Sequence, residues 1–434
     1  MYRISSLPDD LILKIVSFPR TEVAITTSLL SKGWRDVWKH VPKLEYYQRG
    51  LGGSANTGGH TVAWESTLRL RRVEFSNDEI VPRILSGCPV LEDLTVVREH
   101  NGSVKNITIM VPSLLRLTVL DFKFGSQVPG NDVGFVIKAP SLKSLTVVSQ
   151  VSWVCSLVNM PNLVKANIKL PPPGDSKKLL ECLTSAKHLS LCAIPSTFSY
   201  PIGVFHHHVS LKLCTCCSVW FCLILRSDIV EAIRLPGSLY TCQTLVTLRL
   251  LYTFIVDVPL TICFPSLKTL RLRRVEFSND EIVPRILSGC PVLEDLTVVR
   301  EHNGSVKNIT IMVPSLLRLT VLDFKFGSQV PGNDVGFVIK APSLKSLTVV
   351  SQVSWVCSLV NMPNLVKANI KLPPPGDSKK LLECLTSAKH LSLCAIPSTF
   401  SYPIGVFHHH VSLKLCTCCS VWFCLILRSD IVVT

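Results

Sequence analysis

A short motif, Pro89-Val90-Leu91-Glu92-Asp93-Leu94-Thr95-Val96, recurs along this chain and sets its architecture. Its pattern is Pro-x-Leu-x-x-Leu-x-(Val/Leu), and the next three prolines follow after 23, 28 and 21 residues. The same leucine pattern stands at Leu245–Leu250, in a stretch that occurs once in the chain. The other members are Pro112–Val119, Pro140–Val147, Pro161–Ile168 and the degenerate stretches Ala186–Leu191 and His208–Leu213.

The spacing within the motif predicts a short strand with one buried face. Alternating apolar residues place every second side chain on the same side of an extended chain. A single unit cannot bury that apolar face alone, so neighbouring units must stack on one another. The motif at this period is typical of leucine-rich repeats and predicts a horseshoe-like solenoid. Because the period is irregular, we expect uneven connections between the strands.

The repeats lie inside a much longer internal copy. Residues Thr67–Val230 return without a single change as Thr269–Val432, which is 164 residues at a constant offset of 202. Independent drift would have scattered substitutions over both copies. We therefore interpret the copy as a very recent duplication or as an error of the gene model. Residues 67–230 form the first block of repeats, and residues 231–434 form a lead-in repeat plus the second block.

The first 47 residues have a helical pattern. Pro8 suits a first helical position, with acidic residues in the turn that follows. Leu11 begins an apolar series at helical spacing, and Trp34 and Trp38 lie one turn apart. Residues 48–66 are rich in glycine and are expected to form a flexible linker.

Composition argues against several classes of protein. The N-terminus has no apolar run after a basic start, so we expect no signal peptide. The apolar run Val219–Leu225 is too short to span a bilayer, and we expect no membrane contact. We therefore expect a chain of the cytoplasm or nucleus whose 18 cysteines are mostly reduced. The net charge of +15 is spread without a dense basic block, so we expect no nucleic-acid partner.

Metal and catalytic chemistry find little support in the sequence. The run His206-His207-His208, followed by Cys214-Thr215-Cys216-Cys217, contains metal-ligand residue types. It lacks the C-x-x-C spacing of structural zinc sites, and it lies in a repeat strand, so we expect no metal. No nucleophile motif and no glycine-rich phosphate loop is recognisable. We expect no catalytic residue and no cofactor.

The N-terminal region and the repeats together carry a family resemblance. Ile4-Ser5-Ser6-Leu7-Pro8-Asp9-Asp10-Leu11-Ile12-Leu13-Lys14-Ile15-Val16-Ser17, with Ser28–Trp38, resembles an F-box. Stretches such as Ile286–Leu296 resemble the repeats of plant-type F-box/leucine-rich-repeat proteins, many of which end in an FBD domain. The resemblance implies an α/β fold. A three-helix F-box over residues 1–47 would precede an irregular leucine-rich-repeat solenoid that contains the 164-residue duplication.

The resemblance also implies a non-catalytic substrate receptor of a Skp–cullin–F-box ubiquitin ligase. The F-box would bind a Skp-type adaptor, and through it a cullin, while the repeats hold a target protein for ubiquitination. The residues expected to contact the adaptor are Leu7, Pro8, Leu11, Ile12, Ile15, Leu30 and Trp34. The residues expected to contact the target, between the strand leucines, are Glu92, Arg116, Lys143 and Lys165, with Glu294, Arg318, Lys345 and Lys367 in the second copy. The alternative for the first set is the core of a small helical unit, and for the second set ordinary solvated positions.

Departures from the family pattern leave other interpretations open. The family's usual proline falls one position later, at Arg20, and the family often has arginine where Gly33 stands. An FBD-like region follows neither copy, so we expect that domain to be missing. The apolar run Val421–Leu427 would then lie exposed and promote association. The chain could instead be a repeat scaffold or decoy that does not join the ligase, or a mis-assembled, pseudogene-like product.

Overall fold

The computed structural model describes most of the repeat region. The chain divides into two compact units, Met1–His208 with Cys216–Arg226 and Val209–Thr215 with Ser227–Thr434. Each unit holds most of one identical copy. The described residues are 43–47, 66–71, 78–99, 106–122, 134–149, 154–158, 160–169, 181–192, 207–214, 233–235, 237–251, 254–256, 258–259, 261–277, 279–301, 308–324, 336–351, 356–360, 362–371, 384–394 and 411–416.

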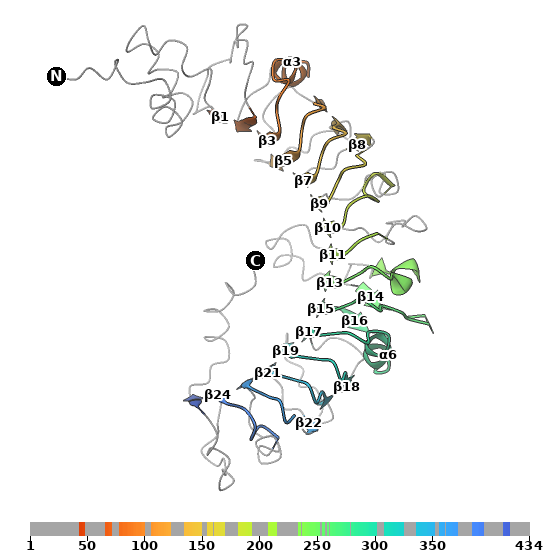
Figure 1. The fold of residues 1–434 in the computed structure, drawn as a ribbon, viewed down its shortest axis with the longest axis vertical. Coiled ribbons are helices and arrows are strands. Elements are labelled where there is room, and N and C mark those ends of the chain that lie inside the picture. Colours follow the sequence, from red (N-terminus) through yellow and green to blue (C-terminus); the bar gives the residue numbers. More distant parts are fainter. Residues whose placement is uncertain are drawn as a thin grey trace, which may run out of the picture. The chain divides into compact units, whose positions relative to one another are not determined.

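In the first unit, parallel strands follow one another side by side in chain order (Figure 1). Helix α3 (Ile80–Ser86) contacts the first strand of a second parallel sheet. That second sheet consists of β4 (Asn106–Met110), β6 (Gly134–Lys138) and β8 (Val154–Val158). The main sheet consists of β1 (Lys43–Tyr47), β2 (Thr67–Arg71), β3 (Asp93–Glu99), β5 (Arg116–Phe122), β7 (Ser144–Ser149), β9 (Lys165–Lys169) and β10 (His188–Cys192).

The second unit repeats this plan. Helix α6 (Ile282–Ser288) contacts β18, and the 3-10 helix η4 (Gly237–Thr241) belongs to the lead-in repeat. The main sheet consists of β11 (Ser210–Cys214), β13 (Thr247–Leu251), β15 (Thr269–Arg273), β17 (Asp295–Glu301), β19 (Arg318–Phe324), β21 (Ser346–Ser351), β23 (Lys367–Lys371), β24 (His390–Cys394) and β25 (Ser412–Cys416). Two small parallel sheets consist of β12 (Ile233–Arg234), β14 (Phe254–Val256) and β16 (Glu276–Phe277), and of β18 (Asn308–Met312), β20 (Gly336–Lys340) and β22 (Val356–Val360).

Each motif makes one turn and then enters a strand, and β5 shows how. The Leu114 amide donates to the carbonyl of Val111 at 3.3 Å and closes the turn. The amides of Leu115 and Arg116 both donate to the carbonyl of Glu92 in the preceding motif, each at 2.8 Å. These bonds set the register between neighbouring strands. Leu114 itself is fully buried, and burial of one leucine contributes about 1.5–3 kcal/mol.

In several motifs the residue after the proline links its turn to the previous one. Ser113 Oγ donates to the carbonyl of Leu91 at 2.8 Å. Asn162 Nδ2 donates to the carbonyl of Pro140 at 3.0 Å. Turn carbonyls that the strand ladder does not use therefore gain side-chain donors from the next repeat.

The predicted architecture of stacked repeats, each with a short strand, is confirmed in the described residues, and the structure adds that these strands are parallel. The connections are uneven, as the irregular period predicts: one contains helix α3, and others contain short strands that the sequence analysis did not identify. Residues Lys43–Tyr47, expected to be helical, form strand β1 instead, because they extend the sheet in register with β2. The three predicted helices and residues 48–65 lie outside the described residues. Among the described helices, none is long and apolar enough to cross a membrane.

Candidate functional site: the outward face of the repeat sheet

Each main strand presents alternate residues to its two faces. In β15, Leu270 and Leu272 are buried, whereas Thr269, Arg271 and Arg273 are partly or fully exposed on the opposite face. Because the strands are parallel and in register, outward residues of neighbouring strands form continuous rows across the sheet. The central row of the second unit, called here the middle row, comprises Lys212, Arg249, Arg271, Thr297, Thr320, Thr348, Asn369, Ser392 and Lys414.

Three cations stand side by side at one end of the middle row. Lys212 of β11, Arg249 of β13 and Arg271 of β15 are direct register partners, and we call them the basic row. All three side chains are partly exposed. The Nε atoms of Arg249 and Arg271 are nevertheless buried, and neither has a hydrogen-bond partner in the described part of the chain.

The positive charges of the basic row lie on neighbouring strands and disfavour one another. Burial, followed by the charge of Arg271, lowers the pKa of Arg249, and Asp295 opposes this shift. Asp295 accepts a hydrogen bond from Arg318 Nε at 3.2 Å. Glu294 accepts one from Lys268 Nζ at 2.9 Å, and this bond lowers the pKa of Glu294. The carboxylates beside the row are thus engaged by other cations.

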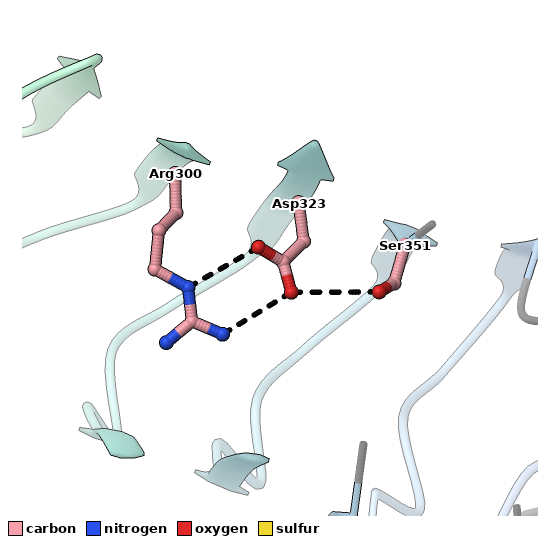
Figure 2. Close-up of polar contacts among 3 residues, drawn as sticks. All are labelled: Arg300, Asp323 and Ser351. Carbon is pink, nitrogen blue, oxygen red and sulfur yellow. Dashed lines mark hydrogen bonds and ion pairs between the residues drawn. The ribbon is translucent and has the colours of Figure 1, made fainter. Parts of the chain in front are cut away.

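The buried face carries a different polar feature, which Figure 2 shows. Arg300 Nε and Nη2 donate to the two carboxylate oxygens of Asp323, at 3.2 and 3.1 Å. Ser351 Oγ donates to the same carboxylate at 3.4 Å. Arg300 also lies over the ring of Phe337, 4.6 Å from its centroid. Because Arg300 is only 6% exposed and the other two polar residues are 0% exposed, we assign this network to the scaffold.

The residues predicted to contact a target lie at the amino-terminal edge of the strands. Arg116 and Lys165 are the first residues of β5 and β9. Glu92 and Lys143 lie one position earlier, in the turns, and not between strand leucines on the sheet face as predicted. All four are exposed, and Arg116 Nε donates to Asp93 at 3.0 Å. The structure therefore brings them together along one edge.

Their second-copy equivalents occupy the same places. Arg318 and Lys367 begin β19 and β23, whereas Glu294 and Lys345 precede β17 and β21 in the turns. Arg318, Lys345 and Lys367 are exposed, and Glu294 is partly exposed. Their role in target binding stays a prediction.

Two further predictions concern residues that the structure does not describe or describes only in part. The expected adaptor contacts, Leu7, Pro8, Leu11, Ile12, Ile15, Leu30 and Trp34, all lie outside the described residues. Of the histidine and cysteine run, His208 is buried and hydrogen-bonded through Nδ1 to the carbonyl of Ala186, and burial lowers its pKa. Cys214 is buried as well. In the described ranges, no three His, Cys, Asp or Glu residues gather as a metal site, and the expected lack of metal stays a prediction.

The basic row was not among the residues predicted from the sequence. A local signal was present, because each member is the central residue of a Leu-x-Leu triplet, and that position faces outward in a strand. Aligning Leu211–Leu213, Leu248–Leu250 and Leu270–Leu272 shows three cations in succession. What the sequence could not show is the register that makes these three residues direct partners.

Comparisons with known proteins agree with the resemblance. The family profile described as "F-box domain" matches residues 4–46, and "Leucine Rich Repeat" matches residues 67–89. The profile "FBD-associated F-box protein At5g56370, LRR repeats" matches residues 221–369. The chain is 39% identical to the putative FBD-associated F-box protein At5g56440 of Arabidopsis thaliana over 99% of this chain and 73% of that protein. It is 30% identical to the F-box/FBD/LRR-repeat protein At5g56420 of the same plant, over 98% of this chain and 73% of that protein.

Proposed function

Because this chain belongs to the plant family of F-box/FBD/LRR-repeat proteins, we propose that it is the substrate-recognition subunit of a Skp–cullin–F-box ubiquitin ligase. F-box/leucine-rich-repeat proteins are typically non-enzymatic substrate adaptors of such ligases, and F-box domains generally bind Skp-type adaptors. In the proposed role, residues 1–47 bind the adaptor and through it the cullin. The repeats bind a target protein, and ubiquitin transfer is performed by other subunits.

The observation that carries the proposal is the continuity of the two parts. The F-box match ends at residue 46, within strand β1, and β1 pairs in register with β2 of the repeat sheet. A binding element for the ligase is therefore joined directly to a broad sheet face suited to a protein ligand. The contribution of this chain to ubiquitin transfer is proximity, which needs no catalytic residue of its own.

The proposal assigns the adaptor contact to Leu7, Pro8, Leu11, Ile12, Ile15, Leu30 and Trp34. Apolar anchors at helical spacing suit a helix-in-groove contact. The charged residues at the strand edges and the basic row are assigned to the target. The proposed location is the cytoplasm or nucleus, where ubiquitin ligases of this type and their adaptors would meet the chain.

Adaptor binding is the direct test. We expect the full chain, co-expressed with a plant Skp-type adaptor, to retain it through affinity purification. Leu7→Asp and Ile15→Asp should each abolish retention, because a charge placed in an apolar contact loses its hydration without gaining a partner. Arg116→Gln, on the repeat sheet, serves as the matched control and should retain the adaptor fully.

Two outcomes would contradict the proposal. Retention of the adaptor by both aspartate variants would remove the F-box contact assigned above. The unmodified chain could also bind no Skp-type adaptor although circular dichroism shows that its repeat sheet is folded. That result would favour the scaffold or decoy role.

A further inference from the structure

The basic row differs from two nearby cations, Arg318 and Lys268, in its counter-ions. Arg318 and Lys268 are each bound to a carboxylate within 3.2 Å. In the part of the chain that the structure describes, Lys212, Arg249 and Arg271 form no ion pair. Like charges directly opposite one another on neighbouring strands destabilise a sheet. The second unit therefore maintains an unfavourable arrangement that an external anion would relieve.

The buried Nε atoms point to the same conclusion. A polar atom that is removed from water without a partner destabilises the folded state, so such atoms in folded proteins call for an explanation. The guanidinium group presents a planar fork of donors that matches carboxylate or phosphate oxygens. An anion over Arg249 and Arg271 could accept hydrogen bonds from two adjacent forks, with Lys212 adding a third charge.

The dimensions suit an extended peptide. Neighbouring strands lie about 4.8 Å apart, so the basic row spans roughly 10 Å. Alternate side chains of an extended peptide lie about 6.6–7 Å apart, so two acidic residues at positions i and i+2 fit within this span. The remainder of the middle row offers hydroxyl and amide groups, with one lysine, Lys414, at its far end and no aromatic side chain. A nucleic-acid strand would need a longer cationic track and aromatic rings for its bases.

We infer that the basic row recognises an acidic segment of the target protein, carrying Asp, Glu or phosphorylated residues in an extended conformation. This inference rests on the proposed function, because it names the chemistry of the target that the repeats would hold. Arg273, exposed two positions beyond Arg271 on β15, extends the positive surface along that strand.

The identical copies supply an internal control. Arg69 occupies in β2 the position that Arg271 occupies in β15, within the same local sequence. The register partner of Arg69 on the preceding strand is Glu45 of β1, whereas that of Arg271 is Arg249 of β13. The equivalent arginine therefore lies opposite a glutamate position in β2 and opposite an arginine position in β15. Only the row that contains Arg271 should bind the acidic segment.

The experiment measures fluorescence anisotropy of short labelled peptides on the full chain purified with its adaptor. The probes are a peptide with glutamate at every second position, its phosphoserine counterpart and a glutamine counterpart. We expect both acidic peptides to bind, more weakly as salt is added, and the glutamine peptide not to bind. Arg249→Gln and Arg271→Gln should each weaken binding about tenfold or more, since a charge-assisted hydrogen bond is worth about 1.5–3 kcal/mol. Arg69→Gln should change it by less than about twofold.

The conservative change Arg271→Lys keeps the charge but loses the planar fork of donors. Its affinity for the acidic peptides should lie between those of the glutamine variant and the unmodified chain. Equal losses in Arg69→Gln and Arg271→Gln would overturn the inference, because they would indicate attraction by overall charge. Unchanged binding in the Arg249→Gln/Arg271→Gln double variant would also overturn it. Tighter binding of a single-stranded oligothymidine at the same arginines would make this a nucleic-acid site and refute a peptide ligand.

Adaptor retention is recorded for every variant in the same preparations. Loss of peptide binding with adaptor retained supports the inference. Peptide binding by a chain that retains no adaptor would contradict the ligase role and leave the acidic-segment site standing. The inference about the acidic segment and the proposed ligase function can therefore be contradicted independently of each other.

Discussion

At the scale of the residue, the ion pair between Arg300 and Asp323 shows how the solenoid tolerates charge in its interior. Both belong to inward positions, one step beyond the leucine and valine layers of their strands. Register places them directly opposite each other, and Ser351 continues the same row on β21. A buried charge is stable only when its partner is held in good geometry, and here both carboxylate oxygens accept a guanidinium donor.

We expect Asp323→Asn to lower the free energy of unfolding by about 3 kcal/mol, because the buried guanidinium of Arg300 loses its carboxylate. Urea unfolding of the full chain measures this loss. Glu281→Gln is the control, since it removes the exposed pair with Arg285 and should cost less than about 0.5 kcal/mol. Equal losses in both variants would mean that the buried pair contributes no more than a surface pair.

At the scale of the element, the end of helix α6 is packed against the lead-in repeat. The Gly289 amide donates to the carbonyl of Ile286 at 3.1 Å, and its own carbonyl accepts from the Phe264 amide at 2.9 Å. A Cβ atom at Gly289 would lie 2.7 Å from the Cγ2 atom and 2.9 Å from the carbonyl oxygen of Ile262. The backbone itself therefore blocks any larger residue at this position, although its φ of −79° is ordinary.

Gly289→Ala should destabilise the chain by about 1–3 kcal/mol, because the added methyl group forces a backbone shift in a packed region. Gly237→Ala is the control, because a Cβ there would meet nothing within 4 Å. Thermal unfolding of both variants checks the difference. If Gly289→Ala unfolds at the same temperature as the unmodified chain, the contact between α6 and the lead-in repeat is looser than the structure indicates.

At the scale of the whole molecule, the same sequence occurs twice and follows a different strand each time. Stability in a repeat protein is the sum of intrinsic repeat terms and nearest-neighbour terms. The intrinsic terms of the two copies are the same because their residues are identical. Differences between the copies must therefore come from the neighbours: the first strand of the first copy, β2, pairs with β1, whereas its counterpart β15 pairs with β13.

Leu117→Ala and Leu319→Ala create the same cavity in the two units, and each should cost about 3 kcal/mol. Hydrogen exchange can localise the effect if it is followed in peptides whose sequences occur only once in the chain. Lys43–Tyr47 and Thr247–Leu251 are two such peptides. We expect Leu117→Ala to speed exchange in the first peptide and Leu319→Ala in the second, because each compact unit opens by itself. Faster exchange of both peptides in either variant would show that the two units unfold together.

The strand positions and their buried leucines could be predicted from the sequence. Alternation within an eight-residue motif is a local signal, and one short motif suffices to place a turn and a strand. The small second sheets were missed, since strands such as Asn106–Met110 and Gly134–Lys138 have no shared motif to align. The strand at Lys43–Tyr47 was missed because its partner lies across an intervening stretch that carries no repeat signal.

The leucine periodicity of this chain was enough to predict stacked repeats, and the F-box stretch together with the repeats was enough to indicate the family, because both depend on patterns within a few adjacent residues. The chemistry of the outward face was decided only by the tertiary structure. Arg69 and Arg271 lie in strands of identical sequence, yet register places one beside Glu45 and the other beside Arg249. The buried pairing of Arg300 with Asp323 depends likewise on register across 23 residues. A strand's own sequence determines which side chains face outward, but only the pairing of strands determines which charges meet.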